Sequence, residues 1–241
     1  MRRYLALIAA CVAAAPASAS LAQAATALDQ LEPSPPDDDF LLVPSTQDPG
    51  RVRPSFGLLV SDAHEPLVVA SVDHETQSVV VERQVVLHAQ AAVGLLHRFT
   101  FDLDMPFTLQ QEGDRELDDP RFPSPDGPAV NDLRLGARFL PIQQHGAWPG
   151  LGVGLAVWLP TGDASLYAGA SVARVAPTIH VSGETRRVDW GAFIEGRFTP
   201  GVTRQLVGSQ LRFGAAAAFK FAFMRVGPEI GVALGTDVND G

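Results

Sequence analysis

The stretch DLRLGARF at residues 132–139 decides the fold class, because its polarity changes at every residue. One face of an extended chain would carry its apolar side chains, Leu133, Leu135, Ala137 and Phe139. The other face would carry Asp132, Arg134, Gly136 and Arg138. A period of two is typical of a β-strand whose two faces meet different surroundings. The stretch therefore predicts a strand with one apolar and one polar face.

The same alternation recurs along most of the chain. It is found at residues 55–72, 84–95, 98–108, 150–159, 172–181, 188–198, 211–219 and 224–234, and the first of these stretches is interrupted at His64, Glu65 and Pro66. Most of the stretches reach about ten residues, which matches the roughly 9 to 11 residues of a tilted membrane strand. Strands of soluble proteins average about five or six residues. Nine strands of membrane-spanning length are therefore predicted.

The connections between these stretches alternate in length. Residues 96–97, 183–186 and 220–223 form short connections and residues 141–148 a moderate one, whereas residues 110–130, 160–171 and 199–208 form longer ones. Membrane barrels alternate short turns at one end with long loops at the other, while a Greek-key sandwich has no reason to do so. We predict an all-β, up-and-down antiparallel transmembrane β-barrel, with about nine strands visible and 10–12 in the complete protein.

The composition excludes several other classes of protein. Of the 241 residues, 46% are hydrophobic, and the formal net charge is −9. This charge disfavours a nucleic-acid partner, and the apolar content disfavours a disordered chain. Beyond residue 30 no run of about 18 uncharged apolar residues occurs, so helical membrane spans are not expected.

Three regions are predicted from the order of these features. Residues 1–24 resemble a signal peptide, with Arg2 and Arg3 before an apolar stretch, and the single cysteine, Cys11, lies within it. Residues 25–53 form an arm rich in proline and aspartate, which we expect to be extended, with the acidic triplet at residues 37–39 in solvent. Residues 54–241 form the barrel. Because bacterial barrels have even strand numbers, we expect it to be incomplete at its C-terminus, with an open or weakly closed seam.

The polar faces of the strands predict which residues line the lumen. The candidates are Arg98, Asp102, Asp104, Arg134, Arg138, Arg174, His180, Asp189, Glu195, Arg197, Arg212, Arg225 and Glu229. Charges in a narrow lumen need one another to offset the loss of hydration, so we expect them to pair across it. The preferred interpretation is a polar plug that satisfies only itself, and the alternative is a constriction that sets solute selectivity.

Residues that would indicate catalysis are sparse. The six histidines form no HExxH or comparable close pair, and no GxSxG elbow or phosphate-binding glycine loop occurs. His180 with Ser182 could mimic a hydrolase site at the barrel rim, but neighbours this close on a strand are far more often coincidental. The acidic loop at residues 110–132 lacks EF-hand spacing and is interpreted as solvated rather than cation-binding. We predict no enzymatic activity, no metal and no cofactor.

Four short segments resemble a known family. The segments ALDQLEPSPPDDDF (residues 27–40), DAHEPLVV (62–69), NDLRLGARF (131–139) and VWLPTGD (157–163) resemble the barrel region of outer-membrane-protein-A-type proteins of myxobacteria, and the last two are also similar to outer-membrane transporter barrels. The resemblance implies a Gram-negative outer membrane, with membrane lipid and lipopolysaccharide as surroundings. Peptidoglycan would be a partner only through a C-terminal domain that is not part of these 241 residues.

These observations lead to one expected function and two alternatives. We expect an exported outer-membrane barrel with a structural role in the envelope or with weak passive pore activity. The first alternative is a transporter barrel for small hydrophobic or polar solutes, passing through the lumen or a lateral gap. The second is a secreted soluble barrel that binds a ligand inside, which would require the apolar faces of the strands to point inward.

Overall fold

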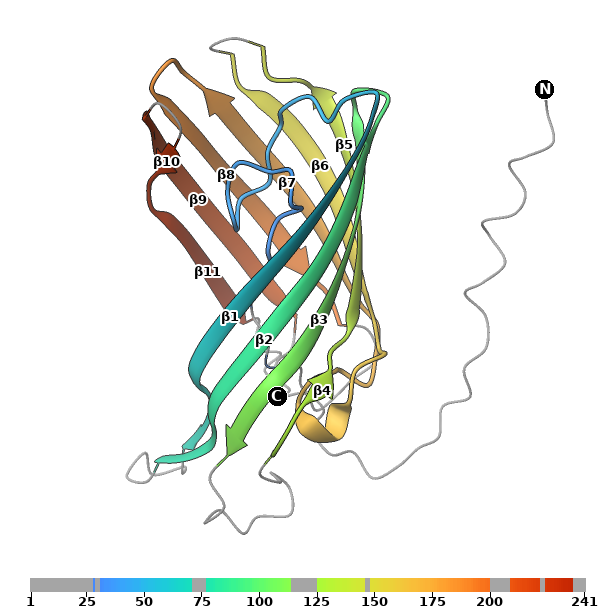
Figure 1. Cartoon of the computed structure of the whole chain (residues 1–241), viewed down its shortest axis with the longest axis vertical. Coiled ribbons are helices and arrows are strands. Elements are labelled where there is room, and N and C mark those ends of the chain that lie inside the picture. Colours follow the sequence, from blue (N-terminus) through green and yellow to red (C-terminus); the bar gives the residue numbers. More distant parts are fainter. Residues whose placement is uncertain are drawn as a thin grey trace, which may run out of the picture.

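The computed structural model describes residue 28 and residues 31–70, 77–113, 125–145, 148–199, 209–221 and 224–235. These residues form one antiparallel sheet that curves into a half-barrel (Figure 1). Its long strands are β1 (Val52–Ala70), β2 (Gln77–Leu95), β3 (Phe99–Gly113), β5 (Leu133–Ile142), β6 (Gly150–Leu159), β7 (Arg174–Glu184), β8 (Val188–Arg197) and β9 (Gln210–Phe221). The last strand is split into β10 (Met224–Val226) and β11 (Glu229–Gly235). Each long strand pairs with the next in the chain, which confirms the all-β, antiparallel up-and-down fold.

The strand bounds differ from the prediction where the alternation fails locally. β2 begins at Gln77, earlier than predicted. Val80 and Val81 are adjacent and both buried, and the register shifts next to Val81, so the alternation on which the prediction rests is interrupted there. β1 shifts register between His64 and Leu67, where the sequence predicts an interruption. The break between β10 and β11 falls at Gly227 and Pro228, and proline has no N–H for the ladder. Two short elements were not predicted: β4 (Ala129–Val130), which pairs with β3, and the 3-10 helix η1 (Ala164–Leu166).

The connections separate by length onto the two ends of the half-barrel. Strand pairs β2–β3, β7–β8 and β9–β10 are joined by two or three residues at one end, which we call the short-turn end and which is uppermost in Figure 1. At this end Leu96 (φ 54°) and His97 (φ 60°) both have positive φ, as a tight hairpin turn requires. The described connection at residues 160–173 lies at the opposite end, which we call the long-loop end and where β3 and β8 end and β5 and β9 begin. The connections bear out the predicted alternation in part, because the seven residues 143–149 between β5 and β6 at the short-turn end outnumber the six residues 71–76 between β1 and β2.

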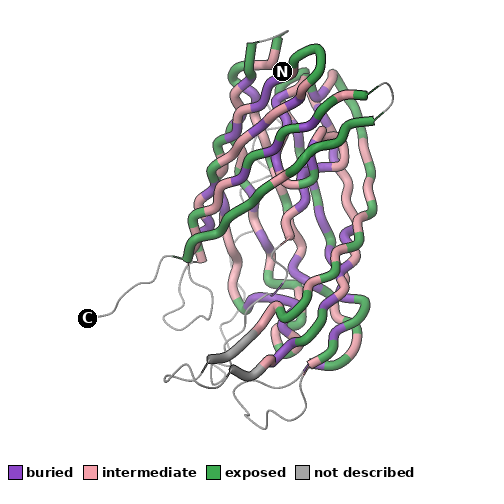
Figure 2. The backbone as a smooth tube through the Cα atoms, turned by 90° about the vertical axis from the view of Figure 1, so that its left-hand side faces the viewer, coloured by how far each residue is buried: buried purple, intermediate pink, exposed green. Residues whose placement is uncertain are grey.

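Burial is inverted relative to a soluble protein. Along β3, Thr100, Asp102 and Asp104 are buried, while Phe101 and Leu103 between them are exposed. The tube in Figure 2 alternates between buried and exposed positions along the strands in the same way. Four of the residues predicted to face outward are exposed, namely Leu135, Val153, Ile230 and Val232, whereas Leu133 and Leu151 on the same face are partly covered. The apolar faces therefore point away from the concave side of the sheet, which we call the lumen.

The two edges of the sheet are not joined to each other by a ladder. Among the described strands, β1 pairs only with β2, and β10 and β11 pair only with β9. The open seam between β1 and β11 agrees with the prediction. β1 begins at the short-turn end and β11 ends at the long-loop end (Figure 1).

The described helical residues are confined to η1, and no helix among them is long and apolar enough to span a membrane.

The proline-rich segment does not lie in solvent as the sequence led us to expect. Residues 31–50, which we call the arm, follow the lumen of the half-barrel and are drawn in blue in Figure 1. Leu28 just before the arm packs on Val80, Val81 and Tyr167 at the long-loop end. The Gly50 carbonyl oxygen at the other end accepts a hydrogen bond from the His97 N–H in the tight turn (2.7 Å). The arm therefore runs the length of the lumen from the long-loop end to the short-turn end.

Candidate functional site in the lumen

Twelve of the thirteen predicted lumen residues point into the half-barrel or contact the arm within it. Arg98 does not, because it lies in the tight turn after β2, where it is exposed and donates to the carbonyl oxygens of Leu140 and Pro141 (3.3 Å each). The alternation failed there because the strand begins one residue later, at Phe99. Arg98 is therefore a rim residue.

Part of the predicted charge pairing is present between strands. Arg134 on β5 pairs with Asp102 on β3, and a Cβ at Gly136 would collide with the same carboxylate. Arg212 on β9 pairs with Glu195 on β8 at 2.9 Å. These contacts confirm that neighbouring strands neutralise some of their inward charges.

Other partners of the lumen charges were not predicted. The Asp104 carboxylate lies 3.0 Å from Nδ1 of His88, and Asp132 lies 3.1 Å from Nη2 of Arg174. Asp189 contacts Lys220 Nζ (2.7 Å), which was not a candidate, and also Arg225 Nε (3.0 Å), a candidate that was expected to pair. The Trp158 ring faces inward, and the guanidinium carbons of Arg134, Arg174 and Arg197 lie 5.8, 5.4 and 5.0 Å from its centroid. Trp158 is therefore a platform for cations inside the lumen.

The arm supplies carboxylates to four of the lumen arginines, three of which also pair with acids on the strands. Glu32 bridges Arg197 and Arg212, and Asp39 pairs with Arg225. Asp38 accepts two hydrogen bonds from the two terminal nitrogens of Arg138, at 2.7 and 3.1 Å. Such two-point contacts are the strongest form of arginine–carboxylate pairing. The expectation that residues 37–39 are solvated is wrong, because strands far along the chain provide cations for them.

Contacts other than ion pairs hold the arm as well. The Glu229 carboxylate on β11 accepts hydrogen bonds from the backbone N–H groups of Leu41 (2.8 Å) and Leu42 (2.7 Å). Phe40 and Val43 pack with Ala216, Ala218 and Phe193. These contacts cover the apolar patch that β8 and β9 present to the lumen.

A pair of hydroxyl groups fixes the arm near the short-turn end. Thr46 donates its backbone N–H to Oγ of Ser182 (2.8 Å), and the two hydroxyl oxygens are 2.7 Å apart. Both residues are buried. Ser182, considered from the sequence as half of a rim hydrolase site with His180, is thus engaged with the arm.

Contacts of the arm reach both sides of the open seam. Asp37 pairs with Arg53 on β1 at 2.9 Å, while Asp39 pairs with Arg225 on β10 and the Glu229 carboxylate on β11 binds the arm backbone. Because β1 and β11 share no ladder, these side-chain contacts connect the two edges of the sheet. The arm therefore acts as a strap across the seam as well as a filling of the lumen.

Burial affects two carboxyl groups that lie outside the strands. Burial raises the pKa of Asp38, and the Arg138 guanidinium opposes this rise. Burial also raises the pKa of Asp132, against hydrogen bonds from the N–H groups of Ala170 and Gly162 and the charge of Arg174. The ionised form is favoured chiefly by Arg138 at Asp38, and chiefly by the two backbone N–H groups at Asp132.

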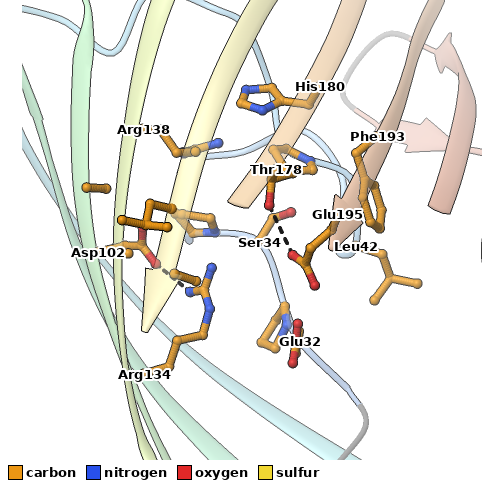
Figure 3. Close-up of a pocket in the computed structure, with 18 of the residues that line it drawn as sticks. Glu32, Ser34, Leu42, Asp102, Arg134, Arg138, Thr178, His180, Phe193 and Glu195 are labelled. Carbon is orange, nitrogen blue, oxygen red and sulfur yellow. Dashed lines mark hydrogen bonds and ion pairs between the residues drawn. The ribbon is translucent and has the colours of Figure 1, made fainter. Parts of the chain in front are cut away.

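Little empty space is left around the arm. One cavity of about 40 Å³ is lined by Arg138, Arg212, His180, Glu32 and Glu195, among others, and Figure 3 shows all of these except Arg212. A water molecule needs about 10–15 Å³ by this measure, so only a few waters fit. A second cavity of about 340 Å³ lies at the short-turn end, and Arg138 lines this one too. The arm therefore leaves room for only a few waters at the first cavity and a larger space at the short-turn end.

The position of the arm in the lumen was not predicted, although the charges of the lumen candidates contained a signal for it. The candidates comprise seven arginines, namely Arg98, Arg134, Arg138, Arg174, Arg197, Arg212 and Arg225, and five acids, namely Asp102, Asp104, Asp189, Glu195 and Glu229. A narrow lumen does not tolerate surplus cations, so the acid-rich segment at residues 32–39 could have been assigned to them. The acids of the predicted long loop at positions 114–119, the predicted signal peptide and the last six residues lie outside the described residues.

Within the described part of the chain, no group of three or more histidine, cysteine, aspartate or glutamate side chains is placed to hold a metal ion. Comparisons of the chain with protein-family models, with curated proteins and with solved structures found no match.

Proposed function

We propose that this chain is an outer-membrane β-barrel protein of a Gram-negative envelope, with a structural role or weak passive pore activity and no catalysis. The observation that carries the proposal is the inverted burial, with polar side chains in the lumen and exposed leucine, valine and isoleucine outside. Hydrocarbon is the solvent that such an outer face fits, and only closed or covered strands satisfy their backbone there. The family resemblance of residues 131–139 and 157–163 points the same way.

The arm supports the low conductance in this proposal. It follows the whole lumen and leaves a cavity of about 40 Å³ lined by Arg138 and Arg212, with the larger cavity of about 340 Å³ confined to the short-turn end. A solute would have to displace it. The surroundings that fit the outer face are membrane lipid and lipopolysaccharide, with peptidoglycan reached only through a further domain.

The open seam favours a second candidate function, a transporter with a lateral gap. β1 and β11 share no ladder, and the arm's apolar contacts beside the seam, made by Phe40 and Val43, could be exchanged for those of a small hydrophobic solute. The secreted soluble barrel is not favoured, because it requires the apolar faces to point inward.

Two measurements on the full chain test the proposal. After refolding into detergent, the protein should float with liposomes in a density gradient and give small, infrequent conductance steps in planar bilayers. If the protein remains at the bottom of the gradient in the absence of detergent, the membrane assignment is wrong. Large, steady conductance would instead show that the lumen is open and that the arm is not a plug.

A further inference from the structure

Arg138 and Arg212 line one small cavity in the lumen, and each is paired with a carboxylate of the arm. Arg138 lies on β5 and pairs with Asp38, while Arg212 lies on β9 and pairs with Glu32. Within the described residues, Asp38 is the only acid that forms an ion pair with Arg138. The strands thus present a cation that the arm, rather than the sheet, neutralises.

Asp38 binds Arg138 in the way that a free carboxylate would. Its two oxygens meet the two terminal nitrogens of the guanidinium, and the two side chains are only 6% and 11% exposed. The planar fork of arginine matches a carboxylate at two points, whatever molecule carries that carboxylate. Nothing in this contact requires the acid to belong to the same chain.

His180 adds a further polar group to the same wall of the lumen. It lies beside Arg138 in Figure 3, lines the same cavity and is 1% exposed. The backbone of Ser45 on the arm is a polar neighbour of the ring, but neither ring nitrogen forms a hydrogen bond of good geometry with a described residue. A buried imidazole without such a bond is costly, and a bound solute would supply the missing acceptor.

The arm can leave the lumen without breaking the sheet. Within the described residues, the backbone of residues 32–49 has one hydrogen bond to the backbone of the rest of the protein, from Gln144 N–H to the Thr46 oxygen (3.4 Å). Pro33, Pro35, Pro36 and Pro44 cannot donate to a ladder at all. Side chains therefore hold the arm, and competing ions can replace them one at a time.

Withdrawal of the arm would leave Arg138 as a buried positive charge without its acid, while Arg212 would keep Glu195 on β8. A guanidinium that loses its partner in a poorly hydrated site costs several kcal/mol, and this cost favours any anion that can take the vacant place. From these observations, and resting on the proposed function, we propose that Arg138, Arg212 and His180 form a lumen site for small carboxylate solutes. Glu32 and Asp38 occupy this site as built-in competitors, so carboxylate binding and arm release are coupled.

The test measures binding of sodium succinate to the full chain in detergent micelles by calorimetry. The variant Glu32→Gln/Asp38→Asn keeps the shape of the arm but removes the competing charges, so it should bind succinate about tenfold more tightly or better than the unchanged protein. Arg138→Met added to this variant should abolish the gain. Asp48→Asn removes an arm carboxylate at the exposed rim and is the matched control, with unchanged affinity.

A reporter on the arm gives an independent readout. In a Cys11→Ser background the chain has no other cysteine, so Ser34→Cys, at a buried position lining the cavity, can be labelled selectively. Succinate should accelerate its reaction with a charged maleimide, and choline chloride at equal ionic strength should not. If the doubly neutralised arm gains no affinity, or if Arg138→Met leaves binding intact, the site is wrong. Either result can occur while the protein still floats with liposomes, so it leaves the membrane proposal standing.

Discussion

The sheet and the arm lie against each other along the whole lumen, yet different forces hold them. The strands are joined by continuous backbone ladders, and their side chains follow a period of two. The arm is held by carboxylates, two hydroxyl groups and a small apolar cluster, contributed by residues up to 188 positions away in the sequence. Changes in the sheet should therefore affect the stability of the whole barrel, whereas changes around the arm should release the arm alone.

The largest effect is expected on the outer face of the sheet. Leu135 on β5 is exposed and pairs with Leu103 and Val157 on the neighbouring strands. Leu135→Arg should lower the free energy of unfolding in liposomes by about 2–4 kcal/mol if the site lies near the bilayer midplane. Urea titration with Leu135→Met as the control measures this. A loss no larger than that of the methionine variant would contradict a lipid-facing position.

The sheet was readable from the sequence because its signal is local. The alternation in DLRLGARF assigns each residue of β5 to a face, and the connection lengths order the strands. Prediction failed where the pattern lapses, at Val80 and Val81 and at Arg98. Most of the polar candidates lie on the concave face of the sheet, because assigning a residue to a face needs only the parity of its position in the strand.

The position of the arm could not be read in the same way. A run of prolines and aspartates has no period, and Asp38 meets Arg138 across 100 residues of chain. Local sequence therefore indicates an extended segment but not its partner. Only the surplus of inward arginines over inward acids links the two regions, and that link requires the faces of all the strands to be known first.

The second prediction concerns the hydroxyl pair that fixes the arm. Ser182→Ala leaves the buried N–H of Thr46 without its partner, which should weaken arm docking by about 1–3 kcal/mol, whereas the Thr46 hydroxyl can still donate to the backbone carbonyl oxygen of residue 182 (3.2 Å). The maleimide reaction of Ser34→Cys should become faster by the factor that corresponds to this loss of docking free energy. The free energy of unfolding of the sheet in urea should stay the same. Ser171→Ala, at an exposed loop position, is the control. If the labelling assay and the urea titration showed equal losses of free energy, the arm and the sheet would unfold as one unit.

A smaller effect should appear when the pH changes. Burial raises the pKa of Asp38 above its ordinary value of 3.8, against the opposing charge of Arg138. Between the ordinary and the raised value, the docked arm keeps a proton that the released arm has lost, so docking weakens as the pH rises through this window. Asp38→Asn should remove this part of the pH dependence of Ser34→Cys labelling. An unchanged profile in the asparagine variant would assign the dependence to another group.

The smallest effect is expected where the arm leaves the lumen. Asp48 and His97 form an ion pair at the short-turn end, with Nδ1 of His97 2.8 Å from the carboxylate, and both side chains are 55% exposed. Water replaces such a contact readily, so Asp48→Asn should change arm docking by no more than about 0.5 kcal/mol. The Gly50 N–H, which donates to Asp48 at 2.7 Å, keeps an acceptor in the asparagine side chain. Labelling of Ser34→Cys measures the outcome. If this variant released the arm as strongly as Ser182→Ala does, the arm would be held from the rim, and the buried contacts with Ser182 and Arg138 would be secondary.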